Sequence, residues 1–299
     1  MRRPLALILA LLATATAVRA QAPPHGSPPP PDPLDGQFRV YDAEGRPSSV
    51  EAVWDAAREA DVLLLGERHD DPVAHALERR LLGLGEEVGS ERMRLGLEMV
   101  ETDVQTALDE YLAGLGRQQD WLAAGRPWAN YADYRPLIEG AREASVPVVA
   151  TNAPGRYVSL VARRGVEALD SLSDAARAWL PPLPAAPASE ALAAKFAEAM
   201  GGAAHGSGPT VGAMLAAQNL RDATMAWRIA ETLRQSPNAF VLHVNGSFHS
   251  EGRLGIPEHL ARYAPDARVL VVTVRPAADV DAAPAPNGDD FVILTRPAE

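Results

Sequence analysis

The chain has 299 residues, a formal net charge of −11 and no cysteine. Its hydrophobic fraction of 47% and charged fraction of 22% suit one large globular domain or two small ones. The missing cysteine excludes disulfides, thiolate metal sites, iron–sulfur clusters and a lipid-modified cysteine, and the acidic balance argues against a general nucleic-acid binder.

The first residues have the pattern of a targeting segment. Arg2 and Arg3 precede an apolar run over residues 5–18, and Val18 and Ala20 place small side chains at the usual cleavage positions. The run is shorter than the ~20 residues that a membrane-spanning helix needs, which disfavours the alternative of an uncleaved anchor. We predict a signal peptide over residues 1–20 and a periplasmic or secreted mature chain without a transmembrane helix.

Proline marks two breaks in the rest of the chain. The stretch APPHGSPPPPDPLDG (residues 22–36) holds seven prolines and cannot form a packed core. We therefore predict a disordered, proline-rich linker over residues 21–37. A second break, PAADVDAAPAPNGDD (residues 276–290), precedes the strand-like run FVILT. A single domain over residues 38–297 is predicted.

Short apolar runs alternate with helical stretches in this domain. Each run is too short for a helix and lacks polar alternation, as expected of parallel strands that are buried on both faces. The predicted strands cover residues 62–66, 94–98, 146–150, 239–244 and 268–274.

Helical signals lie between these strands. Asp71 and Pro72 have the pattern of an N-cap followed by proline at the first helical position, and Val73, Leu77 and Leu81 keep helical spacing. The sequence predicts an α/β fold with a mainly parallel central sheet flanked by helices. The long helical stretches at 102–145 and 187–235 are expected to be insertions that can form a cap.

Titratable side chains lie at the ends of several predicted strands, where open α/β sheets bind ligands. Gly66 is expected to permit a tight turn there. If the strands are neighbours, two carboxylates and two imidazoles converge at one edge. Such a set suits zinc, iron or manganese, or general acid–base catalysis. The candidate catalytic residues and metal ligands are Glu67, His69, Glu98 and His249. Capping of the following helices is the alternative role.

Three further residues are candidates for supporting these side chains. Asn152 and Asn245 also end predicted strands. Asp222 shares a helical face with Leu215 and Ile229, so it interrupts an apolar stripe. A buried carboxylate usually needs a partner, and we expect an arginine or a site histidine beside Asp222. A surface position on a rotated helix is the alternative.

Two histidines are expected to lie outside the site. His75 neighbours Glu78 and Arg79 on the expected polar side of its helix, so we predict that it is exposed. His243 lies inside an apolar strand and is predicted to be a core histidine with satisfied polar atoms.

Five motifs follow one another from about residue 38 to about residue 296: LLLGERHDDPVAH, LGLEM, YADYRPLIEGAREASVPVVATNAP, RDATMA and VNGSFHSEGRLGIPEHLARYAPDARVL. Together they resemble the ChaN-like haem-binding uptake proteins, which share a superfamily with the Tiki proteases and the erythromycin esterases. The resemblance implies export to the cell envelope and a role in haem or iron acquisition. It also implies that Glu67, His69, Glu98 and His249 are the superfamily's site positions.

The chain departs from the family pattern in two respects. Some relatives are lipoproteins, but this chain has no cysteine to carry the lipid. Asn245 and Ser247 also replace small residues that are expected in the last glycine-rich turn.

Haem needs an apolar surface and an axial ligand as well as this polar cluster. The family resemblance suggests tyrosine ligation, and the stretch WANYADYRP offers Tyr131 and Tyr134 as candidates. The alternative is that these aromatic side chains pack around the start of a helix.

Two hypotheses about function follow. The first is an exported haem-binding protein of iron or haem uptake or storage. The second is a metal-dependent or His/Glu-based hydrolase, either a protease or an esterase of the Tiki or erythromycin-esterase kind. No Gly-x-Ser-x-Gly elbow occurs, which disfavours an ordinary serine hydrolase. We expect haem or another small molecule as ligand, and we leave catalytic turnover, a divalent metal and a homodimer open.

Overall fold

The structure is a computed structural model that describes residues 34–88, 91–201 and 210–297. The predicted signal peptide and most of the predicted linker lie outside the described residues. The elements below belong to one compact unit, Gly36–Glu299. In the described ranges, no helix is long and apolar enough to cross a membrane.

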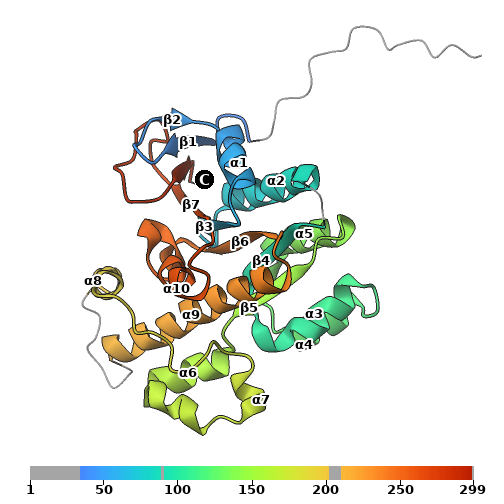
Figure 1. Cartoon of the computed structure of the whole chain (residues 1–299). Helices are drawn as coiled ribbons and strands as arrows, with labels where there is room; N and C mark the ends of the chain where they lie inside the picture. Colours follow the sequence, from blue (N-terminus) through green and yellow to red (C-terminus); the bar gives the residue numbers. More distant parts are fainter. Residues whose placement is uncertain (1–33, 89–90, 202–209, 298–299) are drawn as a thin grey trace, which may run out of the picture. The chain divides into compact units, whose positions relative to one another are not determined.

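Within the described residues, eight strands form one sheet in the order β2-β1-β8-β7-β3-β6-β4-β5 (Figure 1). Every apolar run that was predicted to be a strand forms one, and FVILT forms β8. The strands are β1 (Phe38–Asp42), β2 (Pro47–Ser48), β3 (Val62–Glu67), β4 (Met93–Glu101), β5 (Val148–Asn152), β6 (Phe240–Gly246), β7 (Val269–Pro276) and β8 (Phe291–Thr295).

The sheet is mixed, so the prediction of a mainly parallel sheet was wrong. The strands from β8 to β5 run parallel, but β1 pairs antiparallel with both β8 and β2. The tight turn after β1, in which the Gly45 N–H donates to the Asp42 carbonyl, lets β2 fold back beside β1. These strands are short and partly exposed, so they lack the continuous apolar run by which the others were recognised.

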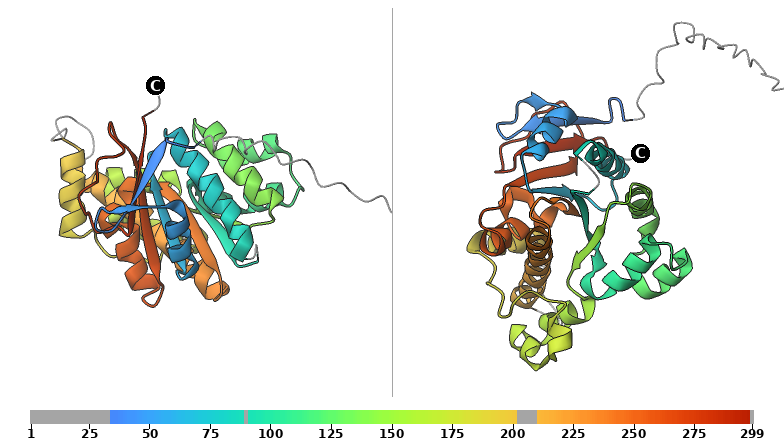
Figure 2. Two further views of the ribbon diagram at one scale, coloured as in Figure 1. Left: turned by 90° about the horizontal axis from the view of Figure 1, so that it is seen from above. Right: turned by 45° about the vertical axis from the view of Figure 1, so that its right-hand side comes forward.

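Helices cover both faces of the sheet (Figure 1, Figure 2). The helices α9 and α10 lie on one face, and α1, α2 and α5 lie on the other. The helices are α1 (Val50–Arg58), α2 (Pro72–Val88), α3 (Gln105–Leu112), α4 (Gln118–Gly125), α5 (Tyr131–Glu143), α6 (Gly155–Arg164), α7 (Asp174–Arg177), α8 (Glu190–Ala199), α9 (Val211–Gln235) and α10 (Ile256–Tyr263). Short 3-10 segments are η1 (Thr102–Val104), η2 (Val166–Ser171), η3 (Ser247–His249) and η4 (Glu251–Arg253).

The two long helical stretches, residues 102–145 and 187–235, do not together form a separate cap. From the second stretch, α9 packs Met225, Ala226 and Ile229 against Val62 and Val241 of the sheet. From the first stretch, α5 packs against α2. Both helices therefore belong to the layers that bury the sheet, because each carries an apolar face that needs cover.

The start of α2 is fixed by the predicted cap. The Asp71 carboxylate accepts hydrogen bonds from the backbone N–H groups of Val73 (2.9 Å) and Ala74 (3.2 Å). Its other oxygen accepts a hydrogen bond from the hydroxyl of Thr295 in β8. The capping prediction is confirmed, and the cap ties the loop that carries His69 to the sheet.

Candidate functional site

The first half of the site is built around Glu67, the last residue of β3. Its side chain is buried, and its Oε1 accepts hydrogen bonds from the Tyr134 hydroxyl (2.7 Å) and from His69 Nδ1 (2.9 Å). Burial by itself would raise the pKa of Glu67, but the hydrogen bonds from His69 and Tyr134, together with the nearby His75, lower it to about 2. Glu67 is therefore a fixed negative charge in the interior.

His69 is the exposed member of this half, with 39% of its side chain accessible to solvent. Its ring meets that of Trp128 edge to face, with the centroids 4.9 Å apart, and Asn130 donates to its backbone carbonyl. Burial opposes a charge on the ring, but Glu67 and Glu98 together raise the pKa of His69. With Nδ1 bound to a carboxylate, Nε2 is the nitrogen left for a ligand.

The second half of the site begins where β4 leaves the sheet register. Pairing of β4 with β6 ends at Leu97 and Val244, and a bulge follows in β4. Glu98 is the next residue of β4, and its Oε2 accepts the N–H of Gly246 at 2.6 Å. The carboxylate thus replaces the backbone carbonyl that would accept this N–H in a regular sheet. The bulge thus turns Glu98 toward the end of β6.

His249 lies between two buried carboxylates. Its Nε2 is 3.2 Å from Glu98 Oε1, and its Nδ1 donates to Asp222 of α9. Burial opposes protonation, but the charges of Glu98 and Asp222 raise the pKa of His249 to about 10. The same burial would raise the pKa of Glu98, yet His249 lowers it to about 2. A protonated imidazole has no lone pair for a metal, so metal binding at His249 requires loss of this proton.

Gly246 joins the two halves. A β-carbon at this position would lie 2.7 Å from His69 Nε2 and 3.5 Å from Glu98 Oε2. Only a residue without a side chain lets His69 and Glu98 approach the same piece of backbone. Since β6 lies between β3 and β4, the structure brings Glu67, His69, Glu98 and His249 together at the carboxyl edge of the sheet.

Gly66 has a different role from the predicted tight turn. It lies inside β3, and a β-carbon there would come within 2.7 Å of Ser250 Oγ and 3.0 Å of Ser247 Cα. The residue therefore leaves room for the loop that carries His249 to cross the end of β3.

The predicted supporting residues hold the strand ends in place. Asn152 donates to the backbone carbonyl of Glu98 and accepts from Arg221 of α9. Asn245 donates to Ser250 Oγ at 2.9 Å, and this bond closes the turn that carries His249. Asp222 is buried beside His249, as the apolar stripe around it indicated.

The two candidate tyrosines differ in position. Tyr134 is 1% exposed and its hydroxyl donates to Glu67, so it is enclosed within the polar cluster. Tyr131 is half-buried one turn earlier in α5, and its hydroxyl accepts from Trp121 Nε1 at 3.2 Å. The structure joins only Tyr134 to the cluster.

His75 was predicted to be exposed, and this was wrong. It is 6% exposed, its Nε2 lies 3.1 Å from Glu67 Oε2, and its ring meets that of Tyr134 edge to face. Glu78, one turn later in α2, is fully buried and was missed as well. The i, i+3 spacing of His75 and Glu78 shows in the sequence that they share one face of α2. Their burial depends on the packing of α5 against α2, which the sequence pattern does not reveal.

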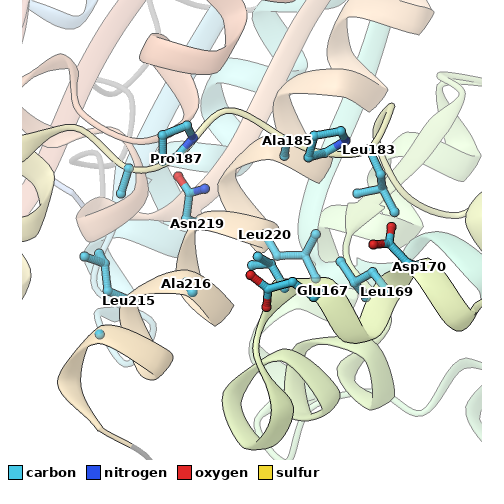
Figure 3. A pocket seen from close by; sticks show the side chains of 14 residues that line it. Glu167, Leu169, Asp170, Leu183, Ala185, Pro187, Leu215, Ala216, Asn219 and Leu220 are labelled. Atoms are coloured by element: carbon cyan, nitrogen blue, oxygen red, sulfur yellow. The ribbon is translucent and has the colours of Figure 1, made fainter.

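An apolar cavity of about 450 Å³ lies elsewhere, between α9, η2 and the proline-rich segment before α8 (Figure 3). Leu169, Leu183, Leu215 and Leu220 line it, with Asn219 as a polar group. Among the described residues that line it there is no tyrosine, histidine or methionine, so these residues offer none of the usual axial ligands for haem.

The family described as haem-binding uptake, Tiki superfamily, ChaN matches residues 53–260. This match covers more than half of the chain and includes all four residues at the carboxyl edge. The chain belongs to the ChaN family.

The chain is similar to solved structures, and the first of these shares its fold. ChaN of Campylobacter jejuni, in a structure described as cofacial haem binding, aligns with a TM-score of 0.67 and 17% identity, over 88% of this chain and 98% of that one. A mutant of the erythromycin esterase EreC in its open conformation gives a TM-score of 0.48 and 12% identity, over 87% of this chain and 83% of that one. No curated protein matches the chain.

The ion pair between Glu98 and His249 should make stability depend on pH. Because the pKa of Glu98 is lowered from 4.5 to about 2, its stabilising contribution is present above pH 4.5 and is lost as the pH falls toward 2. At roughly 1.4 kcal/mol per pKa unit, the loss is about 3 kcal/mol. Urea unfolding of the wild type and Glu98→Gln across this pH range measures it.

Glu98→Gln should show a flatter acid limb than the wild type, since Gln keeps an acceptor for Gly246 but cannot ionise. The exposed Glu143→Gln is the control and should follow the wild type. Parallel acid limbs for the wild type and Glu98→Gln would contradict the assignment.

Proposed function

We propose that this protein binds haem at the carboxyl edge of its sheet and takes part in the uptake or storage of haem iron after export. Its membership of a haem-binding uptake family supports the proposal. The similar ChaN of Campylobacter jejuni is described as binding haem cofacially, and a face-on arrangement needs an open edge with a ligand atom rather than a deep pocket.

The observation that carries the proposal is the setting of His69. Its side chain is 39% exposed, its Nδ1 is held by the Glu67 carboxylate, and Trp128 packs against the ring. A histidine that donates one nitrogen to a carboxylate is fixed in orientation and is a stronger ligand through the other nitrogen. The neighbouring aromatic ring supplies apolar surface for a porphyrin.

The tyrosines have separate parts in this proposal. Tyr131 is half-buried at the same end of α5 and is the alternative axial ligand. Tyr134 is enclosed, and burial together with Glu67 raises its pKa, so it does not ionise to a tyrosinate ligand near neutral pH. Its part is to hold Glu67, which in turn holds His69.

Haem titration of the purified full chain tests the proposal. We expect a saturable Soret shift in the wild type. His69→Ala should change the spectrum and weaken binding by about tenfold or more, because it removes the axial bond. Tyr134→Phe should keep the ligand and the spectrum.

Tyr131→Phe separates the two axial ligands. If this variant, rather than His69→Ala, changes the Soret band, then tyrosine is the ligand and the site moves toward the start of α5. A wild-type chain with no saturable shift would rule out haem binding altogether.

A hydrolase is the second candidate function, and the hydrogen bond between Glu67 and His69 favours it. A carboxylate that orients an imidazole through Nδ1 prepares Nε2 to take a proton from water or from a nucleophile. Under this candidate, protonated His249 supplies a positive charge beside the reacting group rather than a base.

Hydrolysis of an activated aryl ester by the haem-free protein tests the hydrolase. His69→Ala should lower kcat/KM by about 10²-fold or more, which is the usual effect of losing a general base. The control is Tyr131→Phe, which leaves the Glu67–His69 pair intact. Equal rates for the wild type and His69→Ala would exclude this role.

Export is part of the proposal and rests on the N-terminal sequence. We expect the mature chain to begin at or near Gln21, because the short apolar run ends before small residues. N-terminal sequencing of the protein from the periplasmic fraction measures this. An intact Met1 in the membrane fraction would refute it.

A further inference from the structure

A second polar cluster lies on the inner side of Glu67, away from the carboxyl edge of the sheet. We call that edge the haem edge, because it is where we propose that haem binds. It consists of Glu67 from β3 and of His75 and Glu78 from α2, and we call it the inner triad. Their exposed fractions are 1%, 6% and 0%. One ligand atom from each side chain lies within 4.8 Å of the other two. The i, i+3 spacing puts His75 and Glu78 on one face of α2, directed at the end of β3.

Four polar atoms of the inner triad are left without hydrogen bonds among the described residues: Glu67 Oε2, His75 Nε2 and both carboxylate oxygens of Glu78. Glu67 Oε2 and His75 Nε2 face each other at 3.1 Å but outside hydrogen-bond geometry. Buried polar atoms are rarely unpaired, and an unpaired carboxylate is the most costly case.

The surrounding charges do not compensate for Glu78. The carboxylates of Glu67 and Asp71 add negative charge near Glu78, and the neighbouring Arg79 is exposed. The triad therefore requires a positive species, either a proton or a metal ion.

A metal ion satisfies more of these atoms than a proton does. A proton on Glu78 gives one oxygen a hydrogen bond to Glu67 and leaves His75 Nε2 without a partner. A cation at the centre would be coordinated by one oxygen of each carboxylate and by the Nε2 lone pair of His75. The other oxygen of Glu67 is already held by His69 and Tyr134, as the outer partners of a metal ligand usually are.

We propose that the inner triad binds one divalent transition metal ion, such as zinc, manganese or iron, through Glu67, His75 and Glu78. Two carboxylates and one imidazole are a common ligand set for these ions. Bonds of ~2.0–2.2 Å place ligand atoms about 3.5 Å apart in a tetrahedral site. The side chains therefore need to close in by roughly an ångström. The site is separate from haem binding, although both use Glu67.

The experiment uses Co²⁺ as a spectroscopic probe on the full chain. The chain is stripped by unfolding in chelator and refolded with Co²⁺, because a buried site fills most readily during folding. Expression with Co²⁺ in the medium replaces this step if refolding yields are low. We expect one Co²⁺ per chain by elemental analysis, with visible d–d absorption bands and a higher Tm than that of the metal-free chain.

Glu78→Gln is the decisive variant, because glutamine has the shape of a protonated glutamate. It should lower Co²⁺ affinity at least tenfold and remove the effect of the metal on Tm, while circular dichroism verifies the fold. His75→Gln is the second variant and should have the same result. His249→Gln is the matched control, since it removes a buried histidine from the haem edge only.

Two results would overturn the metal site. A wild type that takes up no Co²⁺ or Zn²⁺ means that the triad holds a proton. Unchanged affinity in Glu78→Gln with loss in His249→Gln places the metal at the haem edge instead. Haem binding is measured separately by the Soret titration, so either proposal can fail alone.

Discussion

The buried carboxylate of Glu67 is the group on which the polar interior of this protein depends. One oxygen takes hydrogen bonds from His69 and Tyr134, and the other faces His75. A buried carboxylate stays ionised in a low-dielectric interior only when such partners surround it. Each partner is therefore oriented by the same charge, and Glu67 connects the open edge of the sheet to the inner triad.

Strand order explains how distant parts of the chain meet at this charge. Because β6 lies between β3 and β4, the ends of these three parallel strands are neighbours. The bulge in β4 then turns Glu98 toward Gly246, and His249 follows one short turn after β6. Asp222 reaches the same place from α9, on the covered face of the sheet. The second buried charge, on His249, is thus enclosed by two carboxylates.

The chemistry of the open edge differs from that of the apolar cavity. The described residues that line the cavity include no usual iron ligand, whereas the edge has His69 with a fixed imidazole and an aromatic neighbour. A cofactor that carries its own large apolar surface needs an oriented ligand atom more than it needs a closed pocket. The same edge also presents a proton acceptor beside a cationic His249, which is why binding and hydrolysis are competing functions for one site.

The sequence by itself predicted the apolar strands and the Asp71 cap, and it placed Glu67, His69, Glu98 and His249 at or just past the ends of apolar runs, since these follow from local patterns and turn chemistry. Tertiary structure decided what local patterns do not encode. The strand β1 pairs with β8, more than 240 residues later in the chain, and its short, partly exposed run gives no local signal. His75 and Glu78 looked like a polar helix face, but α5 covers that face and buries them. Gly66 proved to make room for a loop rather than a turn. In each case the deciding contact joins segments far apart in the chain, so only the packed structure contains it.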